Sequence, residues 1–211
     1  MADRGYRGRP QRGERADRQI NAGHSRGLDA ALVKTEAAIR NLKTERIYAF
    51  DENGKELAHS TTGTEHNTKL PKGNYKDSIL THNHPGEGMG NNMAGRIGKP
   101  FSADDIRLAV NYNVKEIRAV TKGYTYSIKR PEKGWFYDRS SRARMVSAFG
   151  GKSNQYSISK FVKRSEYAKN KVAVRNNYQE TRDRIDVVTN HQTLKEICKE
   201  LGWIYTRKRT S

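Results

Sequence analysis

The chain has 211 residues, a formal net charge of +18 and a pI near 10.0, and only 34% of its residues are hydrophobic. We expect neither a membrane span nor secretion through a signal peptide, because no apolar run approaches the about 20 residues that cross a bilayer. So basic a composition predicts an anionic partner, with nucleic acid as the first candidate. The single cysteine, Cys198, excludes an intramolecular disulfide and indicates a reducing compartment.

The N-terminal residues 1–26 are rich in Arg and Gly and contain almost nothing that a core can bury. We therefore expect a basic, disordered arm. Its arginines suit phosphate contacts, and Arg7, Arg9 and Arg12 are the candidate nucleic-acid contacts. A solvated tail that only raises solubility is an equally good interpretation of this composition.

The pattern of apolar residues then predicts an amphipathic helix over 28–43, followed by a strand at 45–50. The Asp-Glu-Asn-Gly sequence at 51–54 is a hairpin turn signal, and a second strand at 57–62 is expected to pair back. A polar loop leads to a third strand at 78–82.

After this strand comes a stretch rich in Gly and Asn, residues 86–101, which has no periodicity and is expected to be a loop beside the candidate site. A helix is expected from Ser102 to near residue 113. Two further strands, at 116–121 and 124–128, form a second predicted hairpin. Residues 27–131 therefore predict one domain with the element order helix, hairpin, strand, loop, helix, hairpin, in an α/β or α+β arrangement.

Residues 132–211 predict a basic helical extension that packs back on the core through its last helix, 194–201, in which Cys198 lies on the apolar face. The protein is thus expected to carry basic extensions at both ends. The candidate nucleic-acid contacts in this extension are Arg142, Arg144, Lys163 and Arg164, together with Arg207, Lys208 and Arg209, which are expected to form a basic tail after the last helix.

Two histidines in the third strand point to metal chemistry. Residues two apart in a strand face the same side, so His82 and His84 can direct both rings to one point. Asp105, in the first turn of the following helix, is the candidate third ligand, which leaves a fourth zinc position for water. Glu45 is the candidate general base, and Ser102 the candidate donor to an oxyanion. Ser102 and Asp105 also match a helix-capping box.

The motif His82-Asn83-His84-Pro85, followed by Ser102-Ala103-Asp104-Asp105, resembles the His-x-His-Pro … Ser-x-x-Asp signature of the JAMM (JAB/MPN+) metalloproteases. Its His-Asn-His-Pro form is similar to the RadC-like branch. The resemblance implies an α/β fold, a JAMM/cytidine-deaminase-like mixed sheet with flanking helices, and one zinc ion held by two His and one Asp. It also implies a separate upstream Glu that activates water, and hydrolysis of peptide or isopeptide bonds.

The segment 28–131 also resembles a domain of phage head-associated and mobile-element proteins. The shared features are the hairpin at 51–54, Thr-His-Asn-His-Pro at 81–85, Phe-Ser-x-x-Asp-Ile at 101–106 and the strands at 116–120 and 124–127. This resemblance implies a bacteriophage or mobile-element origin, in the bacterial cytoplasm or the virion, with protein substrates or virion proteins as partners. The loop 86–101 is longer than is usual between the second His and the Ser of the JAMM signature. A longer loop suits either a substrate lid or a relative that has kept the fold without activity.

Two alternatives to a zinc hydrolase remain. One is a virion-associated structural protein on the same fold that contacts nucleic acid and has no turnover. The other is an HNH-type nuclease, although its ligands are usually spread more widely over a ββα unit. The histidines without metal spacing, which are expected on the surface or in loops, are His24, His59, His66 and His191.

Overall fold

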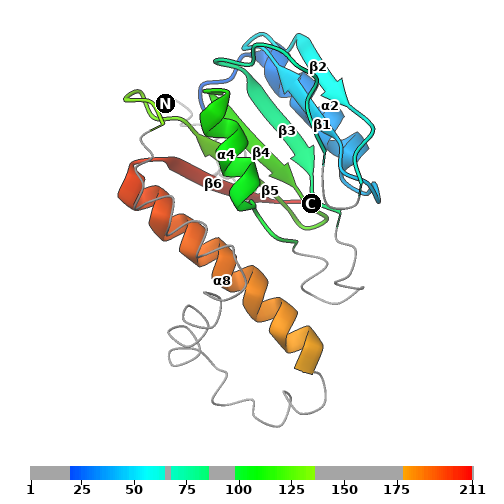
Figure 1. Ribbon diagram of the computed structural model, residues 1–211, viewed down its shortest axis with the longest axis vertical. Coiled ribbons are helices and arrows are strands. Elements are labelled where there is room, and N and C mark those ends of the chain that lie inside the picture. The colour runs from blue at the N-terminus through cyan, green and yellow to red at the C-terminus, as the bar shows by residue number, and fades with distance from the viewer. Residues whose placement is uncertain (1–19, 65–67, 86–97, 136–177, 211) are drawn as a thin grey trace, which may run out of the picture.

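Within the computed structural model, the described residues are 20–64, 68–85, 98–135 and 178–210. They form a mixed α/β structure, as expected, with one six-stranded sheet in the strand order β2-β1-β3-β4-β5-β6 (Figure 1). The elements, in chain order, are α2 (Arg26–Ile39), β1 (Ile47–Phe50), β2 (Glu56–Ser60), β3 (Ile79–Asn83), α4 (Ala103–Asn111), β4 (Glu116–Val120), β5 (Tyr124–Lys129), α8 (Tyr178–Leu201) and β6 (Ile204–Arg209).

The two central strands, β3 and β4, run parallel, whereas the other neighbouring pairs in the described sheet are antiparallel. Parallel neighbours need a crossover, and α4 lies in the connection between them. Because β3 and β4 run the same way, their carboxyl ends meet at one end of the sheet, where the start of β5 and the end of β6 also lie (Figure 1). This end of the sheet carries the candidate site.

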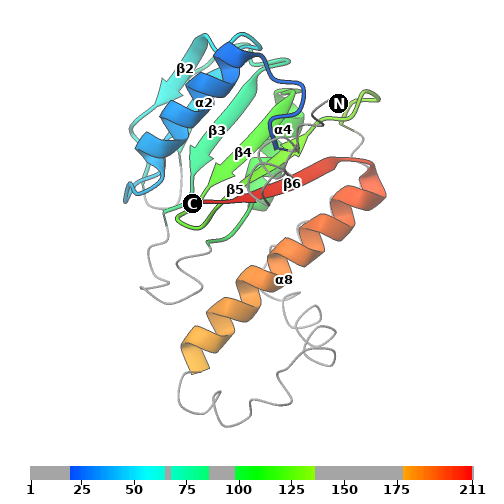
Figure 2. The same ribbon diagram turned by 180° about the vertical axis from the view of Figure 1, so that it is seen from behind.

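The helices cover opposite faces of the sheet. Figure 2 shows α2 in front of β1 and β3, whereas Figure 1 shows α4 in front of β4 on the other side. The last turns of α8 join the α4 side, where Leu194 and Cys198 are buried in the main core, so the expected burial of Cys198 is confirmed. The face under α2 carries only a small apolar cluster, made of Leu28, Leu32, Phe50 and Ile79.

The strand β6 was not expected. Residues 204–209 contain Arg207-Lys208-Arg209, which we interpreted as a basic tail, but they pair antiparallel with β5 along its whole length. Trp203 is buried just before the strand and packs edge-on against Trp135. The helix before it is also longer than the predicted 194–201. In the part of the chain that the structure describes, β6 forms an edge of the sheet.

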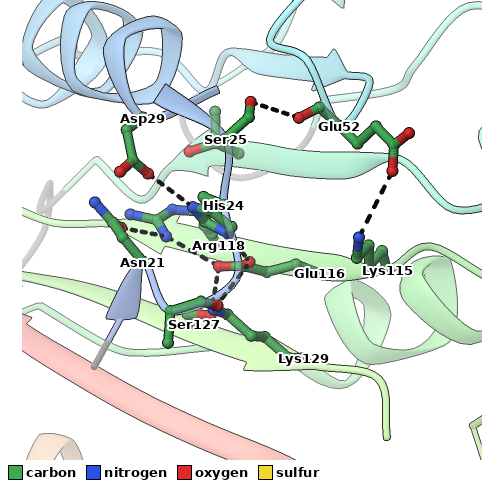
Figure 3. A network of polar contacts seen from close by, with 12 residues as sticks. Asn21, His24, Ser25, Asp29, Glu52, Lys115, Glu116, Arg118, Ser127 and Lys129 are labelled. Atoms are coloured by element: carbon green, nitrogen blue, oxygen red, sulfur yellow. Dashed lines mark hydrogen bonds and ion pairs between the residues drawn. The ribbon is translucent and has the colours of Figure 1, made fainter. Parts of the chain in front are cut away.

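A buried network of charges fills the α2 face (Figure 3). Arg118 of β4 lies between two carboxylates: its Nε donates to Glu36 at 2.5 Å and its guanidinium also donates to Glu116 at 2.9 Å. The carboxylate of Glu116 accepts from the hydroxyl of Ser127 at 2.6 Å as well. Charged residues on a helix and a strand are therefore core residues here.

One of our histidine expectations, the one for His191, is wrong. His24 lies in a loop, as expected, but its side chain is only 5% exposed and its ring lies 2.6 Å from Glu116 and 3.1 Å from Asp29. His191 of α8 is buried against Tyr126 and Tyr205, and this burial lowers its pKa to about 4. His59 is exposed, as expected, whereas His66 lies outside the described residues.

The expected arm 1–26 overlaps the folded part of the chain. Ile20 is buried, and Ser25 caps α2 by accepting from the backbone N–H of Leu28 at 3.1 Å. Packing against the sheet therefore includes residues 20–25, and the arginines Arg7, Arg9 and Arg12 lie outside the described residues. None of the helices in the described residues is long and apolar enough to cross a membrane.

Candidate metal centre

The two histidines of the motif meet at the end of β3. The backbone there is extended, so His82 and His84 project from the same face, and their Nε2 atoms lie 2.9 Å apart. His82 is buried, with 2% of its side chain exposed, whereas the exposed fraction of the His84 side chain is 16%. The ring of His82 is thus enclosed by the core, whereas the ring of His84 is partly accessible to solvent.

Asp105 joins them from the start of α4. Its Oδ1 lies 3.1 Å from Nε2 of His82, and its Oδ2 lies 3.3 Å from Nε2 of His84. One ligand atom from each of these three residues lies within 4.8 Å of the others, so the described structure contains a group able to hold a metal ion. The expectation that Asp105 returns beside His84 after the long loop is therefore confirmed.

The capping box holds the carboxylate of Asp105. Its Oδ2 accepts from the backbone N–H of Ser102 at 2.6 Å and from the Ser102 hydroxyl at 2.8 Å, and the Asp105 N–H donates back to that hydroxyl. The capping interpretation is confirmed, and it is compatible with ligation because Oδ1 still faces His82. The expected oxyanion role of Ser102 stays a prediction.

A backbone carbonyl orients the ring of His84. Its Nδ1 lies 3.0 Å from the carbonyl oxygen of Lys99, which can only accept, so Nδ1 carries a proton and donates. This leaves Nε2 directed at Asp105 and at His82, the arrangement that a metal-ligating histidine commonly shows. Burial lowers the pKa of His84, but the Asp105 carboxylate and the Lys99 carbonyl outweigh it and raise the pKa to about 9.

The charges of the cluster act on one another. Burial raises the pKa of Asp105, but the adjacent rings of His82 and His84 outweigh this effect and hold it well below the usual range. Nδ1 of His82 is buried and has no hydrogen-bond partner among the described residues. The ring of His82 also packs against Phe101, with centroids 6.4 Å apart.

Glu45 lies next to this cluster by strand register. Ile47 of β1 pairs with His82, so two residues back along the antiparallel pair Glu45 comes level with His84 and on the same face. Its charge is close enough to raise the pKa of His84. The residue is half-buried, and its N–H donates to the carbonyl of Thr64.

Asn83 is a site residue that we did not expect. Strand alternation predicts only that Asn83 faces away from His82 and His84. Its buried amide accepts from the N–H of Arg46 at 2.7 Å and donates to the carbonyl of Thr44 at 3.1 Å. These two backbone groups flank Glu45, so Asn83 fixes the chain on both sides of the candidate base. A polar amide within a fully buried strand is the signal that would have identified it.

Gly98 anchors the segment that carries the Lys99 carbonyl. It has a φ of +72°, and a Cβ there would come within 2.5 Å of the Thr121 side chain, so both conformation and space favour glycine. Its carbonyl accepts from the hydroxyl of the buried Tyr126 at 3.3 Å. The end of the long loop is therefore tied to β5, while residues 86–97 lie outside the described residues.

The remaining predicted contacts divide into two groups. Arg207, Lys208 and Arg209 lie in β6 and not in a tail. Arg142, Arg144, Lys163 and Arg164 lie outside the described residues, so their role stays a prediction.

Comparisons of the chain with protein-family models, with curated proteins and with solved structures gave no match. The interpretation of the site therefore depends on its own residues and geometry.

Proposed function

We propose that the protein is a zinc-dependent hydrolase of peptide or isopeptide bonds with a JAMM/cytidine-deaminase-like fold, encoded by a phage or mobile element. The observation that carries the proposal is the convergence of His82, His84 and Asp105 beside Glu45. It matches what the motif resemblance implies for both the ligand set and the upstream base. The phage or mobile-element origin rests on the sequence resemblance alone.

The residues fit a zinc ion. Two imidazole nitrogens and one carboxylate oxygen are a common ligand set for catalytic zinc, and both rings present the same atom, Nε2, to one point. The Lys99 carbonyl fixes the tautomer of His84 that ligation requires, and Ser102 fixes the carboxylate of Asp105. When bound, zinc supplies Lewis acidity for the scissile carbonyl and lowers the pKa of a coordinated water.

Glu45 supplies the proton transfers. Its carboxylate accepts a proton as water attacks the scissile carbonyl carbon, and it gives the proton to the leaving amine as the C–N bond breaks. Asn83 holds the backbone on both sides of Glu45, which keeps this carboxylate level with His84. The Ser102 hydroxyl, at the entrance of α4, is the candidate donor to the developing oxyanion. In that role its single proton turns away from Asp105, whose Oδ2 keeps the hydrogen bond from the backbone N–H of Ser102.

One observation favours a second candidate. Asp105, Ser102 and the two histidines already form a closed hydrogen-bonded cluster, which can stabilise the fold without chemistry. The second candidate is therefore a virion-associated protein on the same scaffold that contacts nucleic acid through its basic residues and has no turnover.

The variant Glu45→Gln separates the two. For the hydrolase, it keeps the zinc content of the wild type but loses at least about a hundredfold in turnover on a panel of peptides and isopeptide-linked substrates. The matched control Glu56→Gln changes an exposed glutamate of β2 and leaves turnover unchanged. A zinc-loaded wild type that is inert on the whole panel favours the second candidate.

A further inference from the structure

One register row of the sheet joins the candidate metal centre to the edge strand. His82 pairs with Ala119, Ala119 pairs with Tyr126, and Tyr126 pairs with Arg207. Residues that are paired across a sheet project from the same face. Arg207 of β6 therefore lies on the same face as His82, three strands away.

A second row, two residues nearer the strand ends, repeats this arrangement. The N–H of His84 donates to the carbonyl of Val120 beside Thr121, the N–H of Thr121 donates to the carbonyl of Tyr124, and Tyr124 pairs with Arg209. The guanidinium of Arg207 lies 5.0 Å from the centroid of the Tyr124 ring, which packs the two rows together. Lys208, between the two arginines, faces the opposite side with Thr125.

Among the described residues between the candidate metal centre and the edge strand, the side chains are positively charged or neutral. Lys99 adjoins Gly98 over this face, and Lys122 lies in the turn between β4 and β5. Arg207, Arg209 and both lysines are exposed, whereas the row residues Ala119, Thr121, Tyr124 and Tyr126 carry no charge. A strip of positive charge thus leads from the candidate centre to β6.

We infer that Arg207 and Arg209 form a subsite for an acidic peptide segment of the substrate that the candidate metal centre cleaves. This inference rests on the proposed function and adds the class of substrate. Three strand spacings of about 4.8 Å separate the arginines from the histidines by about 14 Å along the sheet. An extended peptide covers that distance in about four residues, so the acidic residues lie about four positions from the scissile bond.

The charge of each possible partner indicates which of them can bind the subsite. Residues 1–19 carry six arginines against three acids, and residues 136–177 carry ten basic residues against two acids, so these segments of the chain itself are repelled by the subsite. A second copy, with a net charge of +18, is repelled as well. The complementary partner is an acidic segment of another protein.

The aromatic side chains favour a peptide over nucleic acid. Single-stranded nucleic acid commonly stacks its bases on exposed aromatic rings. Here Tyr126 is fully buried, and the guanidinium of Arg207 covers the ring of Tyr124. The arginines remain available to pair with carboxylates, which they bind in a bidentate manner.

The test is binding of short fluorescein-labelled peptides to the full-length protein, measured by anisotropy at fixed salt. The probe contains a block of glutamates flanked by Gly and Ser, and its matched partner has glutamine at each of those positions. We expect the double variant Arg207→Gln, Arg209→Gln to bind the glutamate peptide about tenfold more weakly. Lys208→Gln, which removes the same kind of charge from the other face, changes affinity less than about twofold.

Charge reversal provides a second test that does not depend on loss of binding. Arg207→Glu with Arg209→Glu is expected to prefer a lysine peptide over the glutamate peptide. Equal binding of the glutamate and glutamine peptides, or equal effects of the double variant and Lys208→Gln, overturns the inference. Loss of affinity for a single-stranded oligonucleotide alone also overturns it and assigns the surface to nucleic acid. The test measures peptide binding and not turnover. A protein that does not bind zinc therefore counts against the proposed function, whereas the comparison of peptide affinities between wild type and variants still tests the subsite.

Discussion

The two faces of the sheet both bury histidine beside carboxylate, but they join these groups in opposite ways. On the α2 face, His24 uses its two ring nitrogens on two separate carboxylates, Asp29 and Glu116 (Figure 3). On the α4 face, His82 and His84 direct the same atom, Nε2, to one point that they share with Asp105. The first arrangement ties segments together, whereas the second brings three donor atoms together that could hold a metal ion.

The two faces also differ in the groups that surround their buried carboxylates. On the α2 face, Arg118 lies between Glu36 and Glu116, and Lys129 adds a further cation 3.8 Å from Glu116. In the described part of the α4 face, the rings of His82 and His84 are the groups that lie against the Asp105 carboxylate. Burial of histidine beside carboxylate is thus no sign of a metal site by itself. The convergence of the donor atoms is the feature that distinguishes the α4 face from the α2 face.

The largest expected effect comes from removing the cation of the α2 face. Arg118→Met removes the buried cation that Glu36 and Glu116 share and is expected to lower the free energy of unfolding by about 3–5 kcal/mol. Denaturant titration measures this loss. Arg107→Met removes an arginine of an exposed pair with Asp104 and is expected to cost less than about 1 kcal/mol. Similar costs for the two variants would contradict a structural role for the network.

Acid is expected to weaken the α2 face next. Burial raises the pKa of Glu116, but the hydrogen bond from His24 and the charge of Arg118 outweigh it and lower the pKa to about 2, from an ordinary value of 4.5. The stabilisation from Glu116 is therefore full above pH 4.5 and is lost as the pH falls towards 2, on the order of 3 kcal/mol in total.

Unfolding free energies measured between neutral pH and pH 2 test this expectation. Glu116→Gln is expected to flatten the acid limb of the curve, because the glutamine does not titrate. Glu52→Gln changes an exposed carboxylate of the same region and should keep the slope. A wild-type slope that survives in Glu116→Gln would be inconsistent with this assignment.

A smaller effect is expected from Asn83→Ala on the α4 side. The change leaves the N–H of Arg46 and the carbonyl of Thr44 without their partner, at a cost of about 1–3 kcal/mol. Because Glu45 lies between these groups, turnover should fall by about tenfold to a hundredfold while zinc is retained. Asn74→Ala, in an exposed turn, is the matched control. Unchanged turnover in Asn83→Ala would show that the two hydrogen bonds of the Asn83 amide do not position Glu45.

Most strands and the candidate ligand set were predictable because their signals are local. The strands at β1 to β5 follow from short β-branched and aromatic runs bounded by turn residues such as Gly54 and Gly123. The ligand set follows from His-x-His in a strand and from Ser102 at a helix start. Each of these patterns lies within a few neighbouring residues.

The parts that were missed depend on residues far apart in the chain. The sequence of β6 predicts a basic tail because it contains the exposed residues Arg207 and Arg209. Only pairing with β5 makes the segment a strand. Arg118 reads as a solvated charge, because its partner Glu36 is 82 residues away. The role of Asn83 likewise exists only once β1 lies beside β3.

The zinc content of the purified protein tests the central claim most directly, measured by mass spectrometry after dialysis and with folding checked by circular dichroism. We predict about one zinc per chain in the wild type and in His24→Gln, whose ring lies on the other face, and none in folded His82→Ala or Asp105→Asn. A wild type without zinc, or His82→Ala and Asp105→Asn variants that still hold it, would contradict the assignment of this cluster as a metal centre.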